Sequence, residues 1–231
     1  MKKLICTIAL LLPCLAFGQG FMPKKAVSLG FQGSYFDLSG SNASVMLLLE
    51  QLNARGSYMS IAPYFSWCYK TDRCIGVKLK YSSASGGIAS MDLNLPGSDM
   101  ELGLNELNAS SNSFVGEIFH RSYMGLDAKN RFGLFLDLAL QYGQTSAALG
   151  SGPDYNSDYS LTRMLKAAAR PGLEVFVMNN VSSVVSIGIG GLYVSETGIY
   201  RSGALSGRKI SSGARFQPDI TDISMGIAVH F

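Results

Sequence analysis

Two histidines, His120 and His230, are the side chains of this sequence best suited to acid–base chemistry. A hydrolytic site would combine one of them with a serine nucleophile and a carboxylate. No Ser/His/Asp constellation is visible around either histidine. His230 precedes the terminal Phe231, and we expect both imidazoles to lie at an interface, half in contact with solvent. The sequence therefore predicts no catalytic residues and no enzyme.

Two cysteines, Cys68 and Cys74, lie symmetrically about Thr71. A tight turn at residues 70–73 would place the two thiols opposite one another on adjacent strands. In an oxidising, exported compartment such a pair can form and keep a disulfide. Metal binding by two thiols without histidine or carboxylate partners is the weaker alternative. We expect a Cys68–Cys74 disulfide, no metal site and no cofactor.

Nine charged residues share one parity of otherwise apolar or small-residue segments. They are Lys78, Lys80, Glu117, Arg121, Asp137, Lys166, Arg170, Glu174 and Asp222. Opposite charges brought together in a space of low dielectric constant should form ion pairs. The elements that carry these residues must therefore present them to a common interior.

Those elements are predicted to be strands with one apolar face and one small or polar face. Alternation of the two kinds of residue predicts strands near residues 27–35, 59–67, 75–81, 117–124, 132–142, 165–177, 185–193 and 223–231. The charges within these segments fall on the face opposite the apolar one. Eight such strands indicate a barrel with an apolar outer surface and a charged interior.

The connections alternate in length. Residues 70–73, 127–130 and 179–180 read as tight turns, whereas residues 38–56, 83–112, 145–160 and 196–216 are long and rich in Ser, Gly and Asn. Outer-membrane barrels have short periplasmic turns and long extracellular loops. A secreted sandwich or a lipocalin-like barrel would carry most of its charge on outward faces. The fold class expected is therefore all-β, an eight-stranded antiparallel transmembrane β-barrel.

The N-terminus indicates export. A basic start, an apolar run to Leu15 and small residues before Gln19 fit a secretory signal peptide. We expect residues 1–18 to be removed and residues 19–231 to form the barrel; lipidation of Cys14 is an alternative that Pro13 disfavours. The formal net charge of +3 gives no basic surplus of the kind that nucleic-acid binding needs.

Three segments carry a family resemblance. Residues 59–82 resemble the strand–turn–strand core of small Gram-negative porin-family β-barrels related to the membrane domain of outer membrane protein A, and residues 119–142 are similar to the next hairpin of that family. Alternating apolar residues before a terminal Phe resemble the family's recognition signal for the barrel-insertion machinery; here they are Ile223, Met225, Ile227, Val229 and Phe231. The resemblance implies a cell-envelope protein of the outer membrane.

Two uses of the charged interior follow from the barrel. It could be a gated narrow pore or a plug of ion pairs, and we expect the plug because side chains fill an eight-stranded barrel. A structural or accessory-subunit role is thus predicted. A narrow pore for small solutes is the first alternative, and a lipid-modifying enzyme is the second.

The expected partners are outer-membrane lipid, the insertion machinery and, through the loops, another outer-membrane protein. The apolar run at residues 45–52 could be that docking surface, or it could pack on the barrel rim. Residues 91–107 are acidic but lack the spacing of an EF-hand loop, so a solvated loop is expected there.

Overall fold

A computed structural model describes residues 20–39, 54–92, 103–150, 159–201, 204–216 and 219–231. Three expectations lie outside the described residues: the signal peptide at 1–18, the apolar run at 45–52 and the centre of the acidic loop at 93–102. Among the residues that are described, no helix is long and apolar enough to cross a membrane.

The described chain consists of strands in which apolar and small or polar residues alternate. These are β1 (Val27–Ser39), β2 (Ala54–Lys70), β3 (Arg73–Asp92), β4 (Gly103–Gly125), β5 (Phe132–Gly150), β6 (Tyr159–Met178), β7 (Val181–Gly188), β8 (Gly191–Arg201), β9 (Ala204–Arg215) and β10 (Asp219–His230). Each predicted strand overlaps one or two of them, as its period of two requires.

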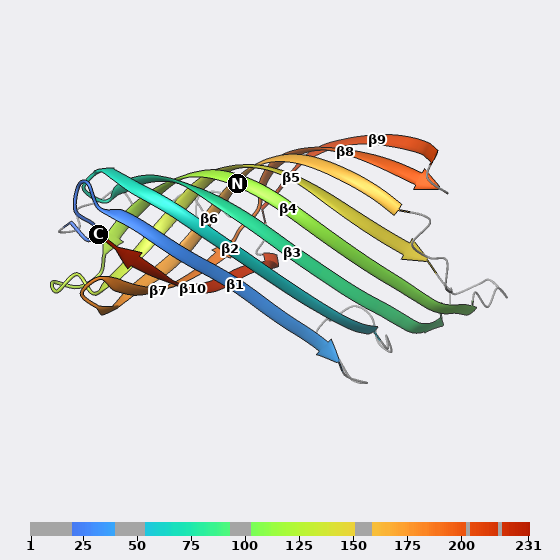
Figure 1. Cartoon of the computed structure of the whole chain (residues 1–231), viewed down its shortest axis with the longest axis horizontal. Coiled ribbons are helices and arrows are strands. Elements are labelled where there is room, and N and C mark those ends of the chain that lie inside the picture. The colour runs from blue at the N-terminus through green and yellow to red at the C-terminus, as the bar shows by residue number, and fades with distance from the viewer. Residues whose placement is uncertain (1–19, 40–53, 93–102, 151–158, 202–203, 217–218) are drawn as a thin grey trace, which may run out of the picture.

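The strands close into a barrel because β1 pairs antiparallel with β2 on one edge and with β10 on the other. From β2 to β6 each strand pairs with the next. β6 then pairs with β8 through its first part and with β7 through its last part, and β10 pairs with β7. β7 and β8 are thus two parts of the seventh barrel strand, and β9 and β10 two parts of the eighth (Figure 1). The fold is a closed, eight-stranded antiparallel β-barrel.

The interruption of the seventh strand is a β-bulge. Between the pairs Ala168–Gly191 and Gly172–Ser186, this strand advances by one residue more than β6. Gly190 lies in the bulge with φ 89°, a left-handed conformation that glycine adopts without steric strain. The eighth strand also shifts register, between Asp219 and Ile223. Alternation alone predicted neither interruption.

Tight turns join the strands at one end of the barrel, here called the short-turn end (Figure 1). Asp72 and Asn130 take positive φ values of 61° and 52° there, which these two residue types tolerate better than most. Asp127 accepts the backbone N–H groups of Phe132 at 2.9 Å and Arg131 at 2.8 Å. These bonds hold the pKa of Asp127 below its usual range.

The outward face of the barrel is an apolar band with an aromatic border. On β5 the outward side chains run from Phe132 to Tyr142 and are followed by the exposed Gln144. Tyr35 on β1 likewise precedes the exposed Asp37. About 9–11 residues of tilted strand are needed to cross a hydrocarbon core, and residues 132–142 fit that length. Exposed large apolar side chains in this pattern are typical of a transmembrane barrel.

Beyond this border the strands continue further than predicted. Much of the segments 83–112, 145–160 and 196–216, which the sequence analysis assigned to loops, is strand. Register pairs such as Ser83–Asn112 and Ser113–Thr145 are polar on polar, so no apolar alternation marked them in the sequence. Backbone ladders hold the extension together regardless of side-chain parity.

Candidate functional site

Arg121 lies inside the barrel between two carboxylates. Register makes Asp137 its Cα partner across β4 and β5. Arg121 Nε and Nη2 donate to Asp137 Oδ1 and Oδ2 at 2.7 and 2.9 Å, and Nη1 lies 3.5 Å from Glu174 Oε2. The guanidinium carbon is 3.9 Å from the centroid of the Phe135 ring. All three charged side chains are at most 1% exposed, so this is a fully buried bidentate ion pair with a second acid beside it.

Arg170 extends the network around the barrel wall. It is the Cα partner of Asp137 on the other side of β5, and the two charged groups lie 3.9 Å apart. Arg170 Nη1 and Nη2 donate to the two carboxylate oxygens of Glu117 at 2.8 and 2.9 Å. Arg170 Nε lies 3.7 Å from Asp222 Oδ2 on β10. One continuous set of ion pairs therefore links β4, β5, β6 and β10.

Two lysines of β3 complete the network, whereas the third predicted lysine stays outside it. Lys78 Nζ lies 3.8 Å from Glu117 Oε1, and Lys80 Nζ lies 2.9 Å from Asp222 Oδ1. Within the described residues Lys166 has no ion pair. The structure thus brings together the predicted charges except Lys166.

Neutral side chains of the same parity supply further hydrogen bonds. Lys78 donates to Gln32 at 3.0 Å, and Tyr123 donates to Glu174 at 2.8 Å. Gln141 Nε2 donates to Glu117 Oε2 at 2.8 Å. These neutral residues were not among the predicted site residues, although their inward parity was a sufficient signal. These hydrogen bonds connect the neutral inward-facing side chains to the ion pairs.

His230 is inside the barrel and buried, so the expectation that it is half-solvated was wrong. Its Nδ1 lies 2.8 Å from Ser28 Oγ, its Nε2 lies 2.8 Å from Ser182 Oγ, and Nε2 is 3.0 Å from Glu174 Oε1. The position beside the C-terminus was misleading, because the inward parity of β10 and the covered short-turn end both bury the ring.

The structure therefore contains a Ser–His–Glu set that the sequence analysis did not find. Ser28 and Ser182 are 1% and 0% exposed, and the Phe176 ring centroid lies 4.9 Å from that of the imidazole. Both ring nitrogens are already hydrogen-bonded. A hydrolytic nucleophile needs a reachable position for the substrate carbonyl. The set is instead suited to joining β1, β6, β7 and β10 at the short-turn end.

Residues 20–26 cover this end of the barrel. The Phe21 ring centroid lies 5.4 Å from that of Tyr123 and 5.3 Å from that of Phe176. The Asp72 N–H donates to the Met22 carbonyl at 3.0 Å, and the Met22 N–H donates to Asp72 Oδ1 at 2.8 Å. Phe21 and Met22 are 3% and 1% exposed. The interior is thus closed by two buried apolar residues, Phe21 and Met22, that precede the first strand.

Cys68 and Cys74 are joined by a disulfide at paired positions on β2 and β3. Both cysteines are buried among the inward-facing side chains. The bond joins β2 and β3 next to their short turn, between that turn and the inward-facing Lys78 and Lys80.

Thiol alkylation tests this disulfide. We expect the unfolded, unreduced mature protein to gain no alkyl group at Cys68 or Cys74, because both sulfurs are bonded. After reduction both should react, and intact-mass spectrometry counts the added groups. Alkylation of both cysteines without reductant would contradict the disulfide.

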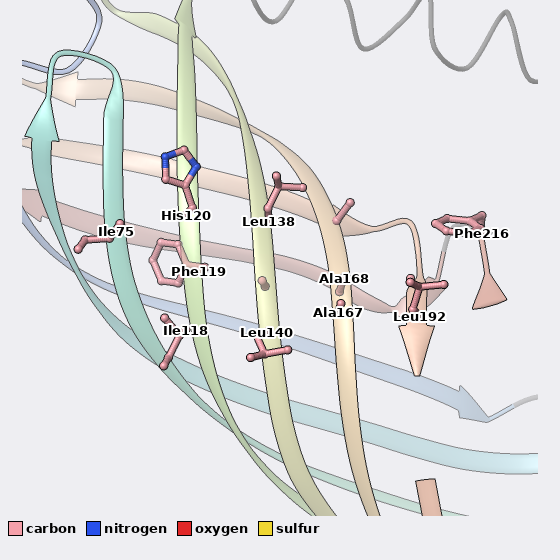
Figure 2. Close-up of a pocket in the computed structure, with 13 residues that line it drawn as sticks. Ile75, Ile118, Phe119, His120, Leu138, Leu140, Ala167, Ala168, Leu192 and Phe216 are labelled. Atoms are coloured by element: carbon pink, nitrogen blue, oxygen red, sulfur yellow. The ribbon is translucent and has the colours of Figure 1, made fainter. Parts of the chain in front are cut away.

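A hollow on the outward face spans β3, β4, β5, β6 and β8 (Figure 2). Apolar side chains line it, among them Leu138, Leu192 and Phe216. His120 stands at its edge and lies 2.9 Å from the Tyr69 hydroxyl, on the outward face that its parity predicted. No group of three or more His, Cys, Asp or Glu in the described segments is arranged to hold a metal ion.

The structure is similar to known outer-membrane barrel structures. No protein-family model matches the sequence, and no curated protein matches it. The chain is similar to the crystal structure of the outer membrane protein OprG from Pseudomonas aeruginosa, with 12% identity, 93% of this chain and 99% of that chain covered, and a TM-score of 0.50. It also matches Neisserial surface protein A (NspA), with 13% identity, coverage of 89% and 97%, and a TM-score of 0.39. At this identity the likeness to OprG shows the fold alone, and that fold is the small eight-stranded antiparallel β-barrel.

Proposed function

We propose that this chain is an integral outer-membrane β-barrel protein with a structural or accessory-subunit role in the cell envelope. In this proposal it is neither a pore nor an enzyme. The observation that carries it is the pairing of buried charges across an interior that a solute would have to traverse.

The outward surface supports the membrane location. Large apolar side chains that are about half exposed, such as Phe31, Leu138 and Ile118, would be unfavourable in water but are suited to lipid. The inward face holds the charges instead. A water-soluble barrel would need the opposite distribution.

The last strand supports assembly by the insertion machinery. Met225 and Ile227 on the outward face of β10 are 62% and 60% exposed, and Phe231 directly after the strand is 71% exposed. Phe231 exchanges backbone hydrogen bonds with Val27, at 2.8 and 2.9 Å, so the terminal residue completes the closing β1–β10 ladder. An exposed apolar row on the closing strand is a suitable recognition signal for that machinery.

The interior argues against both alternatives. A pore requires a continuous water path, but Arg121, Asp137 and Arg170 are 0–2% exposed. Arg170 also forms ion pairs with Glu117 and Asp222, which lie on strands that are not its neighbours. A lipid-modifying enzyme would need its nucleophile near the lipid, whereas Ser28 and Ser182 are buried inside. In the proposed structural role, these ion pairs favour one register of the strands over its alternatives.

Planar-bilayer recording tests the proposed function. We expect the mature, folded protein to insert and to conduct negligibly, because paired side chains fill the lumen. Heat-modifiable migration of the same preparation in gel electrophoresis serves as the control that the barrel is folded. Reproducible open channels from the folded monomer would overturn the proposal in favour of a narrow pore.

A further inference from the structure

A charged patch stands on the outward face of β6, β8 and β9. It consists of Arg163, Glu196, Gly198, Tyr200 and Arg208, which line a small hollow together with Leu161 and Leu205. Register accounts for their common face, because Arg163 is the Cα partner of Glu196 and Gly198 is that of Arg208. We call these five residues the β6–β8–β9 patch.

The patch lies at the border of the apolar band, at the end away from the short turns. Leu165 and Val194 face outward and are about half exposed. Arg163 and Glu196 lie two residues further from the short-turn end on the same strands. Across β5, the Cα partner of Arg163 is Gln144, which follows the border residue Tyr142. In a membrane, this height corresponds to the lipid headgroups.

The charges of the patch favour an anion. Arg208 Nε lies 2.8 Å from Glu196 Oε1, with side chains that are 65% and 39% exposed. Arg163 adjoins the same carboxylate by register and is exposed. Two guanidinium groups around one carboxylate leave a positive surplus, and guanidinium groups bind phosphate in a bidentate manner.

The hollow exists because residue 198 has no side chain. A Cβ there would lie 3.2 Å from the Tyr200 ring and 3.4 Å from Leu205. Tyr200 is stacked on Tyr159, with ring centroids 4.8 Å apart, and so forms a fixed wall. Ile210, the Cα partner of Glu196, is 71% exposed and adjoins the apolar surface of Leu165 and Val194.

We propose that the β6–β8–β9 patch binds a phosphorylated glycolipid of the lipid A class in the outer leaflet. Arg163 and Arg208 contact its phosphate, the hollow at Gly198 accepts the adjoining sugar, and acyl chains lie along Leu165, Val194 and Ile210. The outer-leaflet source follows from the position of the patch at the end opposite the short turns. The proposal rests on the outer-membrane location proposed above.

Native mass spectrometry of the folded barrel in mild detergent tests this site. With added bisphosphorylated lipid A, we expect the double variant R163A/R208A to lower the bound fraction by about tenfold, since it removes two charge-assisted contacts. K209A is the matched control, because Lys209 is an adjacent exposed cation on the opposite face of β9, and it should bind as the wild type does. E196Q should bind more tightly, because it removes the competing carboxylate.

Three outcomes would overturn the proposal. They are equal binding by R163A/R208A and wild type, equal binding of fully dephosphorylated lipid A, and equal binding of phosphatidylglycerol, which carries phosphate without the glucosamine headgroup. Gly198→Leu gives a second check without a change of charge, since it fills the hollow and should also weaken binding. Failure here leaves the conductance result intact, so this site and the proposed function are tested separately.

Discussion

Replacement of Arg121 by methionine is expected to lower the free energy of unfolding by about 3–5 kcal/mol, because it leaves a buried acid without its partner. Asp137 would lose two hydrogen bonds of 2.7 and 2.9 Å, and Glu174 would lose a cation 3.5 Å away. Urea unfolding of the barrel in phospholipid vesicles measures the change. The single tryptophan, Trp67, lies on the outward face and reports the transition by fluorescence.

Lys166→Met is the matched control for this prediction. It removes an inward-parity charge that has no ion pair among the described residues, and we expect a change of about 0.5 kcal/mol or less. The double variant R121M/D137L should recover much of the lost stability, because the stranded charge is removed with its partner. If R121M and K166M unfold at the same urea concentration, the ion-pair network does not hold the barrel together.

The strands could be predicted because burial in this fold follows parity. Phe132, Leu134 and Leu138 had to face one way once Asp137 faced the other, since side chains alternate along a strand. The same rule placed the predicted inward charges on the lumen side, and register then determined which of them meet. Asp137 lies between Arg121 and Arg170 because all three are Cα partners across β4, β5 and β6.

The sequence could not predict features that do not depend on parity. Residues 83 and 112 pair through the backbone with polar side chains on both, so nothing in their composition distinguishes strand from loop. The bulge at Gly190 depends on one glycine among many. The burial of His230 depends on a distant segment that covers the barrel end, and local sequence carries no sign of that contact.

The segment at residues 20–26 separates the charged interior from water at the short-turn end. The charges are isolated from water by aromatic side chains at the short-turn end, where Phe21 lies over Tyr123 and the latter donates to Glu174. Electrostatic interactions strengthen when water is excluded. The ion pairs and the N-terminal segment therefore act together, and removal of the segment should weaken the whole network.

Phe21→Ala is accordingly expected to lower the free energy of unfolding by about 3–5 kcal/mol, the usual effect of truncating a buried phenylalanine. Phe21 is 3% exposed and in contact with two further aromatic rings, so the vacated space cannot be filled from solvent-facing residues. Phe216→Ala is the control, because Phe216 is 71% exposed and its truncation leaves no internal cavity. The same urea titration in vesicles compares the two variants.

A second substitution separates packing of Phe21 from an indirect effect. A Cβ on Gly133 would lie 2.8 Å from the Phe21 ring, so Gly133→Ala should destabilise the wild type by crowding that ring. In the Phe21→Ala background the ring is absent and the added methyl group has space. We therefore expect the double variant to be more stable than the sum of the two single changes predicts, a coupling of about 1 kcal/mol or more for residues in contact. Strict additivity would mean that Phe21 does not occupy the barrel mouth in the folded protein.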